Sequence, residues 1–261
     1  MKQDLTDTTF IIPVRVDTVV RLENLILCVD HVLEWFQTHI VVLEAAPYNN
    51  GLIQKLLGDR ITYCFTEDKD PVYHKTKYLN QMALDVKTEF IGIWDVDIIV
   101  PHEQIVDAMQ HLRQNRCDVA YPFDGDCYDT SDLLRNHYLI HRNLGFLKAN
   151  RNKMQLIYKV EGVIGTVGGA ILIKTDKYLL SGMENEAFYG WGLEDGERYY
   201  RWLSFDFKIY RSKGSVFHLT HTRDANWLTS SKSHHKKARH DMDEIVNYSK
   251  EELYNRFTYS K

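Results

Sequence analysis

Residues 91–100 read Ile-Gly-Ile-Trp-Asp-Val-Asp-Ile-Ile-Val, an apolar run around the triplet Asp95-Val96-Asp97. Apolar residues on both sides of the triplet predict a strand with both faces covered that ends in two carboxylates. Because burying a carboxylate without a counter-charge is costly, a cation is expected beside it. Oxygen ligands at the carboxyl end of a strand suit Mn²⁺ or Mg²⁺, and these ions bind diphosphates. The stretch therefore predicts a metal-held nucleotide site; the alternative is a strand end whose aspartates turn into solvent and cap the next element.

Composition indicates an ordinary globular chain. Its 261 residues fit one α/β domain, and a net charge of −4 leaves no basic face for nucleic acid. Four cysteines without CxxC spacing, no signal peptide and no apolar run of about 18–20 residues favour a cytoplasmic protein. Any membrane contact is expected to be peripheral, at the inner face. The basic run Lys232–His240 could touch an anionic membrane, but a solvated helix face is the better explanation.

Strand and helix patterns alternate along the first half of the chain. Predicted strands are Thr8–Val14, His39–Glu44, Ile61–Thr66, Glu89–Ile99 and Asp118–Phe123. Predicted helices are Leu22–Thr38, Gly51–Leu57, Lys75–Asp85 and 101–114. This alternation predicts an α/β fold with a doubly wound, mostly parallel sheet flanked by helices.

The second half of the chain is less regular. Asp124–Val160 is polar, aromatic and hard to assign, as loops that choose a second substrate often are. Strands are expected at Gly165–Ile173, Phe207–Arg211 and Ser215–Leu219, helices at Lys177–Met183 and Gly196–Phe205, and a helical tail at Ser231–Lys261.

His218 and His221 lie three residues apart, past the end of a predicted strand. A turn there could aim both imidazoles at one ion and complete a site with Asp97. Nitrogen together with carboxylate ligands favours Mn²⁺ over Mg²⁺. The alternative is two histidines in a polar turn.

Glu194 and Asp195 open a predicted helix, where the positive end of the helix dipole keeps carboxylates ionised and where a catalytic base is often found. Helix capping explains one of these carboxylates. The preceding Gly190-Trp191-Gly192 places an indole between two glycines, a flexible loop carrying an apolar plate on which sugar rings stack. A base, an aromatic platform and a metal-bound diphosphate together indicate sugar transfer from a nucleotide donor.

Arg15 and Asp17 follow the first predicted strand, in a loop at its carboxyl end. There Arg15 could pair with a phosphate or a base carbonyl, and Asp17 could accept a hydrogen bond from ribose or uracil. The alternative is an ordinary surface pair that starts the next helix.

These motifs resemble, in the same order, those of the metal-dependent inverting glycosyltransferases of the GT-A fold, most closely the β-1,4-galactosyltransferase family with its bacterial relatives. The family's D-V-D, W-G-x-E-D and H-S-R-D segments are similar to residues 95–97, 191–195 and 221–224. The resemblance implies Asp97 and His221 as metal ligands and Asp195 as the base on the acceptor hydroxyl. It also implies acceptor contacts from Trp191, Gly192 and Glu194. His218 stands where the family has a methionine ligand, and imidazole is at least as good a ligand for Mn²⁺.

Weaker similarities extend to the donor half, and the resemblance runs from Phe10 to Asn226 with Asp124–Val160 unmatched. They imply contacts to the uridine diphosphate from Pro13, Arg15, Asp17, Tyr73, Lys75, Asp95, Val96, Asp97 and Gly168. The implied enzyme carries Mn²⁺, with Mg²⁺ as a substitute, and moves a galactose-type hexose or N-acetylhexosamine from a UDP-sugar to a glycan or lipid-linked saccharide. The chain would be one GT-A domain with a nucleotide-sugar-binding half (1–123), an acceptor and catalytic half (124–230) and a helical tail (231–261).

Two departures from the family pattern and two rival functions stand beside this interpretation. Leu193 replaces a second glycine, which would alter loop motion, and Gly196 interrupts the family's acidic run. A nucleotidyltransferase would also use paired aspartates on Mg²⁺, but it usually has a Gly-rich basic phosphate loop, which Ile11–Asp17 lacks. A sugar-binding or nucleotide-sugar-binding protein without turnover would keep Trp191 and the metal but would not need Asp195.

Overall fold

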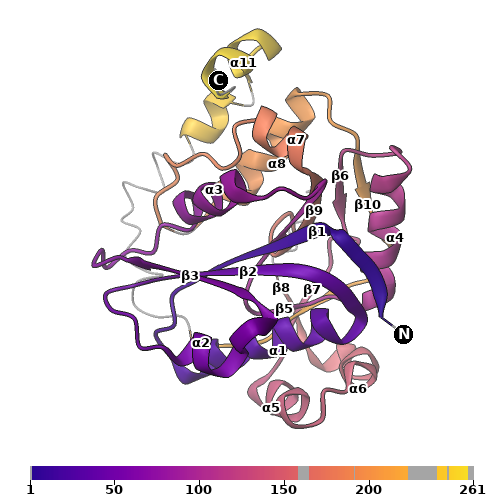
Figure 1. The fold of residues 1–261 in the computed structure, drawn as a ribbon. Coiled ribbons are helices and arrows are strands. Elements are labelled where there is room, and N and C mark those ends of the chain that lie inside the picture. Colours follow the sequence, from indigo (N-terminus) through magenta and orange to yellow (C-terminus); the bar gives the residue numbers. More distant parts are fainter. Residues whose placement is uncertain (1, 158–164, 191, 223–239, 246, 258–261) are drawn as a thin grey trace.

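A seven-stranded mixed sheet forms the centre of the protein in the computed structural model, which describes residues 2–157, 165–190, 192–222, 240–245 and 247–257 (Figure 1). Its strands, in spatial order, are β10 (Ile209–Arg211), β6 (Val119–Tyr121), β9 (Ala170–Lys174), β4 (Phe90–Trp94), β1 (Gln3–Val14), β2 (Phe36–Ala46) and β3 (Thr62–Glu67). Strand β9 runs antiparallel to both β4 and β6, and the other neighbours are parallel. The first βαβ units therefore build one side of the sheet, and later segments of the chain build the other.

A second sheet of four short strands lies beside the end of β4. Its order is β5 (Ile98–Ile99), β11 (Val216–His218), β7 (Cys127–Asp129) and β8 (Gln155–Ile157). Strand β11 pairs with β5 so that His218 lies opposite Ile98, one residue after Asp97. This pairing brings two segments about 120 residues apart in sequence to the same place.

Helices cover both faces of the large sheet. In Figure 1, α3 (Lys75–Asp85), α7 (Thr175–Leu180), α8 (Glu194–Ser204) and α11 (Lys250–Phe257) lie above it, and α1 (Val19–Trp35) and α2 (Leu52–Leu57) lie below. The remaining helices are α4 (His102–Arg113), α5 (Asp132–His141) and α6 (Leu144–Ala149), with short 3₁₀ turns at η1 (Gly58–Arg60) and η2 (Arg151–Lys153). This covering on both faces explains why the central strands are apolar throughout.

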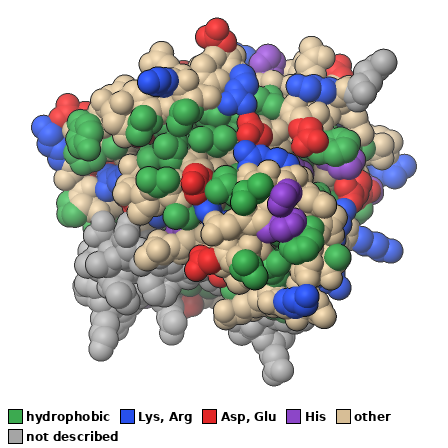
Figure 2. All heavy atoms as spheres, turned by 90° about the horizontal axis from the view of Figure 1, so that it is seen from below, with side chains coloured by type: hydrophobic (Ala, Val, Ile, Leu, Met, Phe, Trp, Pro, Cys, Tyr) green, Lys and Arg blue, Asp and Glu red, His purple; other side chains and the backbone are tan. Residues whose placement is uncertain are grey.

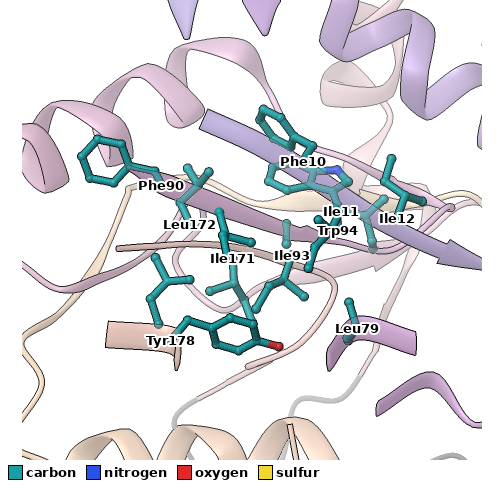
Figure 3. Packing of buried hydrophobic residues seen from close by; sticks show 14 of the residues in the cluster. Phe10, Ile11, Ile12, Leu79, Phe90, Ile93, Trp94, Ile171, Leu172 and Tyr178 are labelled. Carbon is teal, nitrogen blue, oxygen red and sulfur yellow. The ribbon is translucent and has the colours of Figure 1, made fainter. Parts of the chain in front are cut away.

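Figure 3 shows part of the core, where buried side chains of β1, β4 and β9 pack together. The rings of Phe10 and Trp94 pack edge to face with their centroids 5.1 Å apart. Gly92 makes room for this packing, because a Cβ there would lie 2.7 Å from the ring of Phe10. The central strand that carries the two aspartates is thus anchored by close packing on a neighbour.

Several predicted elements need correction. Glu89–Ile99 is not one strand: the chain turns after Trp94, where Asp95 N donates to Gly169 O at 2.8 Å, and Ile98–Ile99 joins the second sheet. Helix α1 ends at Trp35 because the next residues pair with β1, so the helix predicted to Thr38 was three residues too long. Helix α8 begins at Glu194, two residues before the predicted start. Asp124–Val160, where the sequence pattern predicts no regular element, contributes two strands of the second sheet and helices α5 and α6.

Surface charge is mixed on the face seen from below in Figure 2. There the Lys and Arg side chains are interspersed with Asp and Glu instead of gathering in one basic patch. Among the described residues, no helix combines the length and the apolar character that crossing a bilayer requires.

Candidate active site and metal centre

Asp97, His218 and His221 converge at the junction of the two sheets. One ligand atom from each lies within 4.8 Å of the others. Both imidazoles turn Nε2 toward Asp97 Oδ2, at 3.7 Å from His218 and 3.1 Å from His221. The sequence predicted these three residues as one set, and the fold brings them together.

Hydrogen bonds on the far side of each imidazole fix its orientation. Nδ1 of His218 lies 2.8 Å from Asp129 Oδ1, and Nδ1 of His221 lies 3.0 Å from Thr222 O. Such outer partners of metal-binding histidines favour the tautomer whose Nε2 lone pair faces the ion. Two imidazoles and one carboxylate with this arrangement fit a divalent transition-metal ion better than Ca²⁺.

Backbone contacts hold the histidine segment against Asp97. Leu219 N donates to Asp97 O at 2.7 Å, and the side chain of Asn24 in α1 donates to Leu219 O at 2.9 Å. Burial would raise the pKa of Asp97, but the charge of His218 and the hydrogen bond and charge of His221 hold it well below its ordinary value. The carboxylate is therefore ionised and ready to bind a cation throughout the physiological range.

Asp195 lies in the first turn of α8 with its carboxylate between two fixed groups. Oδ1 accepts a hydrogen bond from Arg198 Nη2 at 2.6 Å. Oδ2 lies against Gly168, where a Cβ would be only 2.0 Å away. Among the described residues Oδ2 has no hydrogen-bond partner, and the side chain is 26% exposed, so this oxygen is available to a ligand.

Gly168→Ala is expected to displace the Asp195 carboxylate while leaving the fold intact. Because misplacing a reacting group by about 1 Å can cost about 10²-fold in rate, turnover should fall by that order. The measurement is kcat beside a thermal melt. Gly196→Ala is the matched control, since its Cβ would meet only Met242 Sδ at an ordinary 3.8 Å. Unchanged turnover in Gly168→Ala would contradict the placement of Asp195.

A buried network below Asp195 holds Arg198 in place. The guanidinium is 1% exposed and pairs through Nη1 with Glu184 Oε1 at 2.6 Å. Tyr178 donates to the same oxygen at 2.7 Å, and Asn80 binds the backbone of Glu184 from α3. The base candidate is therefore oriented by a rigid, desolvated pair.

Arg198→Met is expected to lower the free energy of unfolding by about 3–5 kcal/mol, because it leaves the Glu184 carboxylate buried without a counter-charge. Urea denaturation measures the change. Arg256→Met is the comparison: its guanidinium is 41% exposed and lies 3.9 Å from Glu244, so the loss should stay below about 1 kcal/mol. Equal losses in the two variants would overturn the account of the buried pair.

Glu194 is buried at the start of α8, 5% exposed, and its Oε2 accepts from Gly192 N at 2.7 Å. Burial and the neighbouring charge of Asp195 raise the pKa of Glu194 to about 7, although Lys75 lowers it. Leu193 before it has φ +70°, in the left-handed region that favours glycine. The resemblance already placed a glycine of the family at this position.

The raised pKa of Glu194 makes stability depend on pH. Between the ordinary value of 4.5 and about 7 the folded chain holds more protons than the unfolded chain, so stability falls as pH rises through this window. This rise in pH should lower the free energy of unfolding of wild type by about 3 kcal/mol. Glu194→Gln should remove that loss, because glutamine does not titrate. Denaturation of both proteins at pH 5 and pH 8 measures the difference. Parallel pH profiles would show that Glu194 is not the titrating group.

Lys75 connects the base side of the site to the metal side. Its Nζ pairs with Asp95 Oδ1 at 2.6 Å. Burial would lower the pKa of Lys75, but the charges of Asp95, Asp195 and Glu194 raise it well above its ordinary value. A fixed ammonium therefore lies among four carboxylates, counting Asp97 beside Asp95.

The other predicted donor residues lie in and just after β1, just before α3, and in the turn between β4 and β5. Arg15 donates to Asp68, Ala45 O and Asp70 O and lies over the ring of Tyr73, with the guanidinium 5.4 Å from the centroid. Asp17 pairs with Arg21 at 2.9 Å. Pro13 and Val96 are buried, and the hydroxyl of Tyr73 is buried without a hydrogen-bond partner among the described residues. Arg15 therefore supports the 68–71 loop, and its predicted contact with the diphosphate remains a prediction.

Some predicted residues lie outside the described part of the chain, and some important ones were not predicted. Trp191, Arg223, Asp224 and residues 231–239, 246 and 258–261 of the predicted tail are not described. Asp129 and Arg198 were missed. The only available signal was that Asp129 lies in the polar segment 124–160 and that Arg198 follows Asp195 at helical spacing.

The family model described as the N-terminal domain of galactosyltransferase matches residues 147–224. The match starts inside Asp124–Val160, which was expected to be unmatched, and spans Glu194, Asp195 and both histidines. No curated protein sequence matches the chain.

Two solved structures are similar in fold. TarS (residues 1–349) of S. aureus is 13% identical with a TM-score of 0.59, over 98% of this chain and 70% of TarS. The catalytic domain of Drosophila β1,4-galactosyltransferase 7, solved with xylobiose, is 15% identical with a TM-score of 0.52, over 89% of this chain and 79% of that domain. The fold and the family-model match together support a glycosyltransferase of the GT-A fold.

Proposed function

We propose that the protein is a metal-dependent inverting glycosyltransferase that moves a galactose-type hexose or N-acetylhexosamine from a UDP-sugar to a glycan hydroxyl. One observation carries the proposal: the Asp97–His218–His221 set and the Asp195 carboxylate lie at the same edge of the sheet, joined by Lys75 and Asp95. In such a reaction a divalent ion stabilises the leaving diphosphate, and a nearby base accepts the proton of the acceptor hydroxyl.

Asp97, His218 and His221 would hold Mn²⁺, with Mg²⁺ as a substitute. When bound, the ion supplies positive charge to the leaving diphosphate. Lys75 adds a fixed ammonium on the same side of the site. The loop of Arg15 and Tyr73 would seat the uridine end of the donor.

Asp195 would act on the acceptor. Its Oδ2 takes the proton of the acceptor hydroxyl while that oxygen attacks the anomeric carbon and the bond to the diphosphate breaks on the opposite face. The configuration of the anomeric carbon therefore inverts. Arg198 keeps Oδ1 occupied, so the proton is accepted at the oxygen that faces the ligand.

The proposal includes a cytoplasmic setting with at most peripheral membrane contact. All four cysteines are free thiols, and three of them are buried, which suits a reducing compartment. The acceptor would be a glycan or a lipid-linked saccharide reached from that side.

The experiment is binding and slow hydrolysis of UDP-galactose, UDP-N-acetylgalactosamine, UDP-N-acetylglucosamine and UDP-glucose, with Mn²⁺ and with a chelator. We expect one sugar to be preferred and both activities to require the metal. If none of these donors binds in either condition, the proposed function fails.

A further inference from the structure

The edge of the large sheet continues past the base to a strand that the proposed mechanism does not use. Strands β4, β6 and β10 are mutually parallel and β9 opposes them, so Asp95, Gly169 and the carboxyl ends of β6 and β10 share one edge. Along this edge the metal side comes first, then Gly168 beside Asp195, then Tyr121 and Arg211, which lie opposite each other. Arg211 therefore lies on the side of the base away from the donor.

Arg211 is half-buried, and its contacts differ from those of the other buried and half-buried arginines of the described chain. Arg15, Arg135, Arg198 and Arg201 each meet a carboxylate. Arg211 has no ion pair within the described residues: Nη1 donates to Thr166 O at 3.1 Å, and the guanidinium lies 4.4 Å from the centroid of Tyr121. The carboxylate oxygens of nearby Asp124 accept from Asp126 N and Gly214 N instead. Because a partly desolvated cation without a direct ion pair is costly, an anionic ligand is expected here.

Arg211 and the two residues that it contacts each have one buried polar atom without a hydrogen-bond partner in the described structure: Arg211 Nη2, Thr166 Oγ1 and Tyr121 OH. The Tyr121 side chain is completely buried. Together they offer a guanidinium N–H and two hydroxyl donors, the groups that recognise carboxylate or phosphate oxygens. Unpartnered buried polar groups in one place indicate an occupant, either a ligand or ordered water.

This cluster is close enough to the base to serve the same acceptor molecule. Thr166 precedes Gly168 by two residues, so their Cα atoms are at most about 7 Å apart. Gly168 in turn touches Asp195 Oδ2. One sugar ring with its substituents is long enough to span residues this near to one another.

We propose that Arg211, Thr166 and Tyr121 bind an anionic group of the acceptor, a carboxylate or a phosphate, beside the hydroxyl that Asp195 deprotonates. The inference rests on the proposed function and adds a substrate class to it: the acceptor is an acidic saccharide. The rival occupant is water, which would give no preference for charge.

The test compares matched probes in calorimetric titrations of the full chain with Mn²⁺ and UDP present. Methyl β-glucuronide and methyl β-glucoside differ only in the carboxylate, and glucose 6-phosphate supplies the phosphate. Wild type should bind one of the two anionic probes at least about tenfold more tightly than the glucoside. Which anion is preferred identifies the source of the charge.

Arg211→Met should abolish this preference and leave UDP binding unchanged, and Arg211→Lys should keep part of it. Lys208→Met removes an exposed cation just before the same strand and is the matched control, expected to bind like wild type. Thr166→Val tests the site with a nearly isosteric change, should Arg211→Met fail to fold, and should weaken anion binding about threefold or more.

Equal affinity of wild type for charged and neutral probes, with UDP still bound, would overturn the anionic subsite alone. If wild type does not bind UDP with Mn²⁺ present, the proposed function itself is overturned. Anion preference that persists in both Arg211→Met and Thr166→Val would place the anion elsewhere.

Discussion

Asp195→Asn is expected to lower kcat by about 10²–10⁴-fold, because it removes the proton acceptor for the attacking hydroxyl. Asparagine preserves the shape of the side chain and can still contact Arg198 through its amide oxygen. Donor affinity should therefore stay within about threefold of wild type. Initial rates of transfer or donor hydrolysis, beside titration of UDP, measure the two quantities separately.

This variant also separates the rival functions. A sugar-binding protein without turnover would show no transfer or hydrolysis in either wild type or the variant. A nucleotidyltransferase would release diphosphate from a nucleoside triphosphate instead of sugar from UDP-sugar. Asp176→Asn, on the exposed first turn of α7, is a suitable control for the loss of one negative charge. Full activity in Asp195→Asn would remove Asp195 from the proposed role.

His221→Ala is expected to abolish metal-dependent activity at ordinary Mn²⁺ concentrations. It removes one of the three proposed protein ligands, and among the described residues it leaves His218 as the one imidazole that turns Nε2 toward Asp97. Asp129→Asn, which changes only the outer partner of His218, should weaken Mn²⁺ binding by about 10–100-fold. Activity measured against Mn²⁺ concentration gives both effects.

His240→Ala is the control for these substitutions, because its imidazole is 72% exposed and, within the described part of the chain, its ion pair is with Glu244 at 3.5 Å. It should leave the Mn²⁺ dependence unchanged. Equal effects of His221→Ala and His240→Ala would mean that the imidazole at 221 plays no special part.

Local signals in the sequence predicted some elements with accuracy. Helix α3 has the predicted bounds Lys75–Asp85, because its apolar spacing and its flanking residues agree. The strand predicted at Glu89–Ile99 was wrong, since apolar residues continue through the turn at Asp95. Only the pairing of Ile98–Ile99 with β11, far away in the chain, separates the two strands. Such pairings carry no local signal.

In the candidate site, too, some residues could be predicted from local sequence and others could not. The convergence of Asp97, His218 and His221 followed from residue type and strand ends, and the structure brings these side chains together. The partners that orient them could not be predicted. Asp129 reaches His218 through the pairing of β7 with β11, and Arg198 depends on Glu184 and Tyr178 meeting beneath α8. Outer partners are set by tertiary packing and leave no spacing pattern in the sequence.

The most direct test of the central claim is electron paramagnetic resonance of Mn²⁺ titrated into the protein with UDP present. The free-ion signal should fall as one equivalent binds to wild type and should stay nearly unchanged with His221→Ala. A wild-type protein that leaves the free-ion signal intact would contradict the account, because Asp97, His218 and His221 would then not form a metal site.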